Sequence, residues 1–133
     1  MSVNITQQPF VVMAAGEAVW SYILQNEYLT VRASRLGATL RRLVFRGDMV
    51  LGYDSLEDYI HSDGYVGATV GRVCNWVGGA YFTLNGVTYP LVQNDGSNHL
   101  HNGISGFDRH IWSAGITQNG VCLSRTSPDG EEG

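Results

Sequence analysis

Residues 81–91 read YFTLNGVTYPL, in which two short runs of alternating apolar and polar residues flank an Asn-Gly pair. A type I′ turn needs positive φ at both of its central positions, and Asn and Gly are the residues that adopt positive φ most readily. The pattern therefore predicts a β-hairpin whose strands are residues 81–84 and 87–91, with Asn85-Gly86 as the turn.

The rest of the chain also consists of short apolar runs between turn residues. Its 17 glycines and only three prolines indicate many tight turns, and hence many short strands. The other predicted strands are residues 20–25, 28–33, 36–40, 42–45, 49–53, 67–71, 111–116 and 121–125. One helical turn is expected at residues 55–59, with Asp54 or Ser55 as N-cap, whereas residues 1–16 are weakly patterned. We therefore predict an all-β chain, an antiparallel β-sandwich in which residues 1–133 form a single portion without an internal boundary.

The last seven residues, SPDGEEG at 127–133, form turns and carry acidic groups, so they supply no final strand. A sheet that closes in this way keeps an unpaired edge, which is a template for pairing with another chain. We therefore expect the sandwich to be incomplete in this chain. Self-association of two copies through the open edge is one consequence to test.

Composition excludes several functional classes. The 133 residues are 44% hydrophobic and 15% charged, with a net charge of −4 and no basic block larger than Arg41-Arg42, so we expect no nucleic-acid partner. Both arginines are interpreted as solvated charges at a sheet edge. Neither a membrane span nor a signal peptide is visible, and we expect a cytoplasmic protein without a membrane partner. Cys74 and Cys122 lie in apolar contexts and are expected to be buried thiols.

The loop that follows the first hairpin, residues 94–103, concentrates amide and imidazole groups. Its polar members are Asn94, Asp95, Asn98, His99, His101 and Asn102. Such groups bind the hydroxyls of a neutral polyol, and an aromatic side chain can pack on the C–H face of a sugar. Asn and Gly also serve simply to make turns, so the pattern alone leaves a purely structural loop open. His99 and His101 have no third ligand nearby, and we expect no metal site.

Four motifs in this order resemble the aldose 1-epimerase family, also known as galactose mutarotases. They are GATVGRVCN (67–75), NHLHNG (98–103), GFDRHIW (106–112) and SPDGEEG (127–133). The upstream segments LGATL (36–40) and VLGY (50–53), together with Tyr59, fit as well, so the resemblance runs from about Glu27 onward.

The resemblance implies a large β-sandwich whose members are much longer than this chain, which would correspond to roughly their N-terminal two-fifths. It also implies an enzyme that interconverts the α and β anomers of free hexoses such as galactose or glucose without a cofactor. In that family a glutamate removes the proton of the anomeric hydroxyl while a histidine protonates the ring oxygen. Both residues belong to motifs beyond Gly133, and Glu131 and Glu132 belong to a different motif. No complete catalytic pair is therefore expected in this chain.

Three residues inherit a sugar-binding role through the resemblance. His101 matches the loop histidine that binds the sugar and would act as an auxiliary to catalysis. Asn75 matches the asparagine of an Asn-Arg pair whose arginine is replaced here by Trp76, which is either a sugar platform or a core residue. A tryptophan can stack on a sugar but lacks the five-donor fork of a guanidinium. Asn102 stands where the family has glycine.

Other polar residues of these motifs are interpreted as structural. We expect Arg72 to hold strand ends, His99 to point away from His101 and to be structural, and His110 to lie at the surface. Two functional hypotheses remain. One is a portion of a hexose mutarotase that binds the sugar substrate but lacks the acid–base pair, and the other is a non-catalytic carbohydrate-binding or regulatory module.

Overall fold

The computed structural model describes residues 2–12, 16 and 18–131. Its strands are β1 (Asn4–Val12), β2 (Ala18–Gln25), β3 (Thr30–Ser34), β4 (Leu40–Val44), β5 (Trp76–Val77), β6 (Tyr81–Leu84), β7 (Val87–Pro90), β8 (His99–Leu100), β9 (Ser113–Ile116) and β10 (Val121–Ser124). Its helices are α1 (Leu56–His61) and two 3₁₀ turns, Gly78–Ala80 and Phe107–Arg109. The strands pair antiparallel, and the all-β prediction is confirmed. In the described part of the chain, no helix is long and apolar enough to span a membrane.

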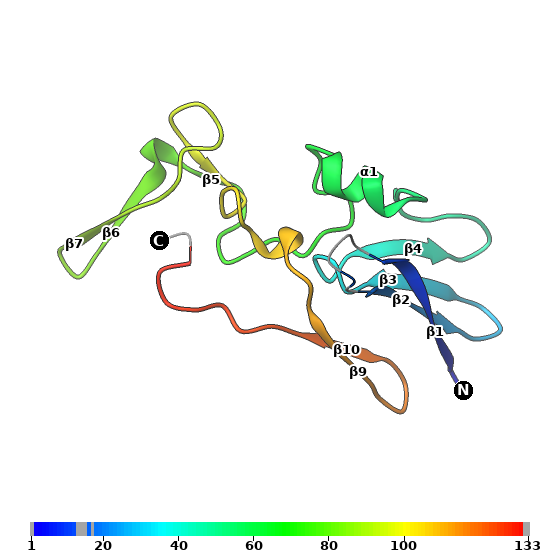
Figure 1. Cartoon of the computed structure of the whole chain (residues 1–133). Coiled ribbons are helices and arrows are strands. Elements are labelled where there is room, and N and C mark those ends of the chain that lie inside the picture. The colour runs from blue at the N-terminus through cyan, green and yellow to red at the C-terminus, as the bar shows by residue number, and fades with distance from the viewer. Residues whose placement is uncertain (1, 13–15, 17, 132–133) are drawn as a thin grey trace.

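The largest sheet has the order β1-β2-β3-β4, and α1 lies beside it (Figure 1). Val19 and Tyr22 of β2 are buried, and Leu56 at the start of α1 is also buried and lines the same small cavity as Val19. The predicted helical turn is confirmed, since the Ser55 hydroxyl accepts a hydrogen bond from the backbone N–H of Asp58 at 3.1 Å and caps the helix. A small core between β2 and α1 therefore anchors this half of the molecule.

Strand β1 was not predicted. Its nine residues, NITQQPFVV, mix polar and apolar side chains without a regular alternation, and most of them are exposed. The strand lies at the edge of the sheet and pairs with β2 along its length, with a register shift between Pro9 and Val11. An edge position with a local irregularity is where a strand tolerates a proline, because one side of its backbone needs no partner.

Three predicted strands are absent from the described structure. Residues 36–40 contain a turn with positive φ at Gly37 and Ala38, and Leu36 forms only an isolated bridge, to Ile111. Residues 49–53 were expected to pair with the preceding strand, but only an isolated bridge between Val44 and Asp48 and one hydrogen bond from the Met49 N–H to the Leu43 carbonyl form. Residues 67–71 are an extended loop that presses against neighbouring backbone. A Cβ added to Gly67, which has φ of +65°, would lie 2.1 Å from the Leu40 carbonyl oxygen. Close approach, rather than strand pairing, therefore explains this glycine.

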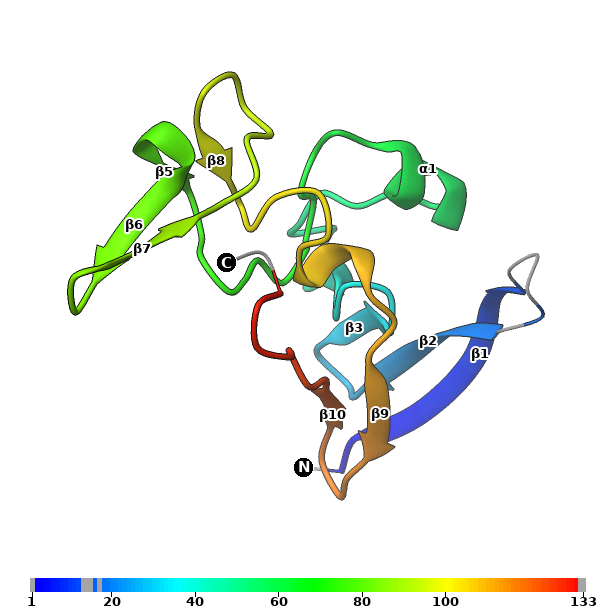
Figure 2. The ribbon, with the colours of Figure 1, turned by 60° about the vertical axis from the view of Figure 1, so that its left-hand side comes forward.

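The hairpin of β6 and β7 is confirmed, with φ of 51° at Asn85 and 80° at Gly86. It projects from the body of the molecule, and Figures 1 and 2 show it at the far end from β1. All eight strand residues are exposed. One face of the hairpin, here called the apolar hairpin face, consists of Phe82, Leu84, Val87 and Tyr89. The rings of Phe82 and Tyr89 stack at 5.0 Å between centroids.

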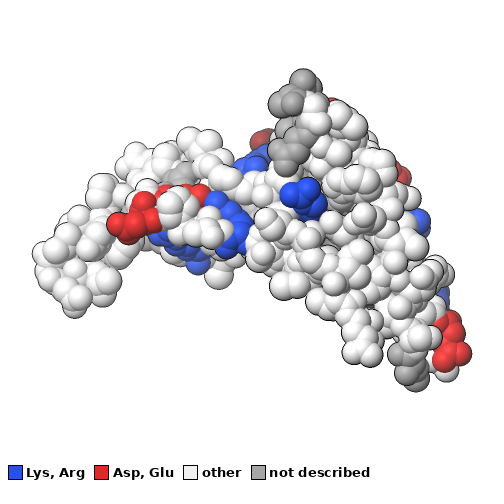
Figure 3. Space-filling view, turned by 60° about the horizontal axis from the view of Figure 1, so that its bottom comes forward, with Lys and Arg blue, Asp and Glu red and all other residues white. Residues whose placement is uncertain are grey.

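This projecting hairpin also carries no charge. Residues 73–94 contain no Asp, Glu, Lys or Arg, and the hairpin end of the molecule is free of charged residues on the face seen in Figure 3. The molecule exposes 8209 Å² of surface, whereas a globular protein of 14.5 kDa exposes about 6,900 Å². The surplus, on the order of 1,300 Å², indicates that the chain leaves unburied a surface that a closed domain would bury.

Two expectations about burial were wrong. Cys74 and Cys122 are both exposed, because Cys74 lies in the loop that leads to the projecting segment. On β10 the half-buried positions are Val121 and Leu123, so Cys122 points to the other, open face of the strand. Arg41 is not a solvated edge charge either: it is partly buried, and its guanidinium carbon lies 3.4 Å from the centroid of the Phe10 ring. Arg42 is exposed, as predicted.

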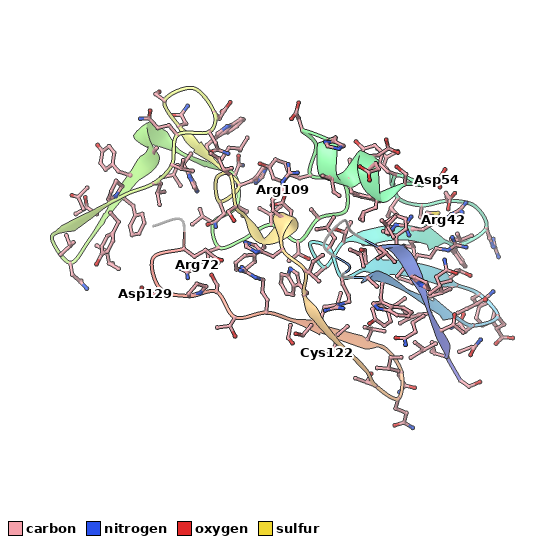
Figure 4. All side chains as sticks on the ribbon, in the orientation of Figure 1. Arg42, Asp54, Arg72, Arg109, Cys122 and Asp129 are labelled. Atoms are coloured by element: carbon pink, nitrogen blue, oxygen red, sulfur yellow. The ribbon has the colours of Figure 1, made fainter. Side chains whose placement is uncertain are left out.

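Strands β9 and β10 form the second predicted Asn-Gly hairpin. The C-terminal segment that follows them is held in place by an ion pair and by hydrogen bonds. Arg125 donates two hydrogen bonds to the Glu131 carboxylate, at 2.9 and 2.6 Å, and Ser127 donates a third. Arg72 donates to the Ser127 hydroxyl at 2.8 Å and to the Pro128 carbonyl, which agrees with its structural interpretation. Figure 4 shows Arg72 beside the segment that carries Asp129. Glu132 and Gly133 lie outside the described residues.

The Glu131 interactions predict a pH dependence of stability. Hydrogen bonds from Arg125 and Ser127 lower the pKa of Glu131 to about 2, from 4.5. Because the folded-state pKa is depressed, the stabilisation is complete above about pH 4.5, declines as the pH falls, and is lost below about pH 2. We expect Glu131→Gln to lower the midpoint of thermal unfolding at pH 7 and to flatten its fall between pH 5 and pH 2. Glu57→Gln on exposed α1 is the control, and an equal effect of both substitutions would contradict the assignment.

Candidate functional site

The candidate site forms where β5 pairs with β8, which brings residues 75–77 beside residues 99–101. Asn94 braces the loop between them, since its side chain accepts from the Leu100 N–H at 2.7 Å and donates to the Leu100 carbonyl at 2.9 Å. Both hydrogen bonds of this amide are therefore used to fix the backbone. Asn94 was a candidate sugar ligand by residue type, but the structure gives its side chain a positioning role.

Asn75 and His101 contact each other directly. The backbone N–H of Asn75 donates to Nδ1 of His101 at 3.0 Å, and the backbone N–H of His101 donates to the Asn75 carbonyl at 3.2 Å. Both residues have positive φ, 66° and 51°, so each sits in a tight local bend. Since Nδ1 accepts a hydrogen bond, the neutral imidazole carries its proton on Nε2. The ring thus presents an N–H donor on the side opposite Asn75.

An aromatic ring from a distant segment completes the surroundings of His101. Tyr65 packs against the imidazole with ring centroids 4.5 Å apart and an interplanar angle of 60°. Tyr65 also lines an open groove of about 570 Å³ whose other lining residues are Asp63, Asn94, Leu100, Gly103, Ile104 and Arg109. Burial raises the pKa of the Tyr65 phenol, and the nearby Asp108 adds to the effect, so the hydroxyl remains a hydrogen-bond donor. Sequence reasoning missed Tyr65, because no local pattern connects it with residue 101.

Trp76 is an exposed residue and not part of the core. Its side chain is 64% accessible, and its indole Nε1 donates to the Asp95 carboxylate at 2.7 Å. That hydrogen bond uses the single donor of the indole and fixes the ring relative to the loop. The core interpretation of Trp76 is therefore wrong, whereas the flat face of the ring remains open to a ligand.

The remaining polar residues of the motifs are structural. His99 is fully buried and shares a hydrogen bond of 2.8 Å with the Val92 carbonyl, as expected for a histidine that points away from the groove. Asn102 is also buried, and its φ of 69° shows why the family pattern favours glycine there. His110 is only partly exposed, and its Nε2 lies 3.6 Å from Glu131. No group of three or more potential ligand side chains suitable for a metal occurs among the described residues.

The site thus combines imidazole, amide and indole groups on antiparallel strands near an open groove. The family model described as Aldose 1-epimerase matches residues 21–133. The chain therefore belongs to the aldose 1-epimerase family. It is 41% identical over 138 residues to galactose mutarotase of Bos taurus, covering 98% of this chain and 40% of the bovine protein.

Solved structures agree with this assignment. Galactose 1-epimerase from Lactobacillus acidophilus superposes with a TM-score of 0.85 at 28% identity, over 98% of this chain and 41% of that structure. An aldose epimerase homologue from C. elegans gives a TM-score of 0.74 at 29% identity, over 81% of this chain and 35% of that structure. The fold expectation of a mutarotase-like sandwich is thereby confirmed. The chain spans about two-fifths of the length of the galactose mutarotases it matches.

Proposed function

We propose that this chain supplies one wall of the hexose site of an aldose 1-epimerase, an enzyme that interconverts the α and β anomers of a free sugar such as galactose or glucose. The observation that carries the proposal is the reciprocal hydrogen bonding of Asn75 and His101 beside the groove lined by Tyr65. This pairing fixes the imidazole so that one N–H donor faces away from the backbone, as needed to bind a hydroxyl.

Each of the three proposed sugar contacts has a separate role. His101 donates through Nε2 to a ring or exocyclic hydroxyl. The side-chain oxygen of Asn75 accepts a hydrogen bond from the backbone N–H of Trp76 at 3.0 Å, which leaves the side-chain NH₂ of Asn75 as a second donor. The exposed indole of Trp76 packs on the C–H face of the sugar, because its own N–H is already bound to Asp95. None of these groups performs the proton transfers of anomer exchange.

The proposal predicts binding without turnover. Galactose or glucose titrated into the 133-residue chain is expected to give saturable binding by NMR chemical-shift changes, while polarimetry shows no acceleration of the α-to-β relaxation. His101→Ala should weaken binding about fivefold to tenfold, since an aligned hydrogen bond to a sugar hydroxyl contributes about 1–1.5 kcal/mol. His61→Ala, on the exposed surface of α1, is the matched control. Unchanged affinity in His101→Ala would overturn the site, and turnover by this chain would overturn the division of roles.

A non-catalytic carbohydrate-binding module is the second candidate. It is favoured by the same observation, since the binding cluster is formed within this chain by residues that do not need a catalytic partner. The two candidates differ when the chain is mixed with a polypeptide that carries the remaining strands of the family fold. A mutarotase portion gains activity in that mixture, whereas an independent binding module does not.

Self-association is proposed as a property of the chain in isolation. Strands β6 and β7 pair only with each other in the described structure, so both outer edges of the hairpin are open. The apolar hairpin face is exposed beside these edges. Edge pairing together with burial of this face would remove both from water in a single contact.

A further inference from the structure

Three arginines meet on one side of the large sheet, away from the sugar-binding cluster. Arg32 on β3 lies directly opposite Arg42 on β4 in the antiparallel register. Arg41 occupies the register shift next to this pair, as the extra residue of a bulge. Like charges directly opposite each other destabilise a sheet, so this arrangement calls for a compensating negative group.

The arginines surround a cavity of about 200 Å³. Its lining residues are Arg32, Arg41, Arg42, Asp48, Val50, Gly52, Tyr53 and Asp54. The lining is mainly polar, and Figure 4 shows Arg42 and Asp54 near each other beside α1. A cavity of this size exceeds the roughly 30 Å³ that one water molecule occupies in the liquid several times over. It therefore has room for a small ion together with part of its hydration shell.

Only one of the three guanidinium charges has a carboxylate partner. Arg42 forms two hydrogen bonds with Asp48, at 2.7 and 2.6 Å. Arg41 reaches only neutral oxygens: the Ser21 hydroxyl at 3.3 Å and the backbone carbonyls of Tyr53 at 3.3 Å and Asp54 at 3.2 Å. Its charge is therefore not balanced by an ion pair within the described residues.

Arg32 and Arg41 also have unused donors. The Nε atoms of both side chains are buried and have no hydrogen-bond partner in the described structure. A buried donor without a partner is rare, and each instance needs an explanation such as a bound ion. Burial lowers the pKa of Arg41 and the charge of Arg32 adds to this effect, whereas Tyr59 and Asp54 oppose it.

We propose that this cavity, here called the arginine cavity, binds a small anion of the phosphate class between Arg32 and Arg41. Three guanidinium groups and the carboxylates of Asp48 and Asp54 line the cavity, so its lining carries a net charge of +1, which favours an anion. The planar guanidinium fork presents its donors at the spacing of phosphate oxygens. None of the residues of this site belongs to the Asn75–His101 cluster, so the anion would be a separate ligand and not the hexose.

The test is titration of the full 133-residue chain with inorganic phosphate, followed by ³¹P NMR line broadening and by thermal unfolding. We expect saturable phosphate binding that chloride at the same ionic strength does not reproduce. Arg32→Gln should weaken phosphate binding about tenfold or more, because a hydrogen bond to a charged group contributes about 1.5–3 kcal/mol. A second arm with methyl phosphate distinguishes a free ion from the phosphate of a larger molecule, and saturable binding in either arm supports the site.

Arg46→Gln is the matched control, since Arg46 is an exposed arginine of the neighbouring turn that does not line the cavity. It should leave phosphate affinity within about twofold. Arg41→Gln is the second variant, which keeps the test meaningful if one substitution disturbs the fold, and far-ultraviolet circular dichroism checks both. The proposal is overturned if phosphate stabilises no more than chloride does, or if Arg32→Gln and Arg46→Gln weaken binding equally.

Discussion

Gly67→Ala is expected to lower the urea concentration at the midpoint of unfolding of this chain by a large part of its wild-type value. The Gly67 carbonyl accepts a hydrogen bond from the Leu40 N–H at 2.8 Å, and this contact ties the loop that leads to Asn75 onto the large sheet. A methyl group there would lie 2.1 Å from the Leu40 carbonyl oxygen, a separation that only backbone movement can relieve. The left-handed conformation adds about 1–2 kcal/mol for any residue with a Cβ. Clash, strain and the lost hydrogen bond together amount to about 3 kcal/mol or more, a large part of the stability of a small domain.

Substitutions at two further glycines distinguish the cost of the steric clash from the cost of positive φ. Gly86 also has positive φ, but a Cβ there would meet no atom within 4 Å, so Gly86→Ala carries the conformational cost alone. Gly78→Ala meets neither a neighbour nor a positive φ and should be close to neutral. Urea unfolding followed by circular dichroism measures all three variants. If Gly67→Ala and Gly86→Ala unfold at the same urea concentration, the contact with Leu40 does not hold the loop.

Leu84→Lys is expected to convert a self-associating chain into a monomer. The apolar hairpin face is exposed and uncharged, and a contact between two copies would remove its apolar side chains from water. An ammonium group at its centre would have to be buried without a counter-ion, which costs several kcal/mol. Each 1.4 kcal/mol weakens association about tenfold, so the dissociation constant should rise by more than two orders of magnitude. Sedimentation velocity across a concentration series measures this change.

Thr83→Lys provides the matched control for the hairpin. Thr83 is adjacent in sequence and equally part of β6, but it pairs with Thr88 on the opposite face. The same charge placed there should leave association within about tenfold, since an exposed lysine is solvated in both states. A wild-type chain that sediments as a monomer at every concentration would contradict the self-association proposal.

Features set by neighbouring residues were predictable from the sequence. Both Asn-Gly hairpins and the Ser55 cap form as expected. The φ preference of Asn-Gly accounts for the first turn only, since Asn85 and Gly86 have positive φ whereas Asn119 and Gly120 do not. Strand β1 could not be predicted, because its polar residues are held by pairing with β2 and not by their own pattern. The exposure of Cys122 also depends on tertiary structure. Apolar neighbours in sequence predict burial only where other elements of the fold cover that face of the strand.

Only those residues of the candidate site that belong to a family motif were predictable from the sequence. The motifs of the family resemblance indicated Asn75 and His101 as sugar-binding residues, and in the structure reciprocal hydrogen bonds join the two residues. The contact of Tyr65 with His101 was not predictable, since it joins segments 36 residues apart without a shared pattern. The bracing role of Asn94 was hidden as well, because an asparagine that binds its own loop and one that binds a sugar are identical in sequence.

The hydrogen bond from Arg72 to Ser127 has a consequence for the order in which contacts form during protein synthesis. These residues are 55 positions apart, and the whole proposed sugar-binding segment lies between them. Closing a loop of that length costs chain entropy that local contacts do not offset, so the contact forms after shorter-range structure. A ribosome releases the hairpin and the histidine loop well before Glu131 emerges. Arg72 and Ser127 therefore form their hydrogen bond only after translation has passed Glu131.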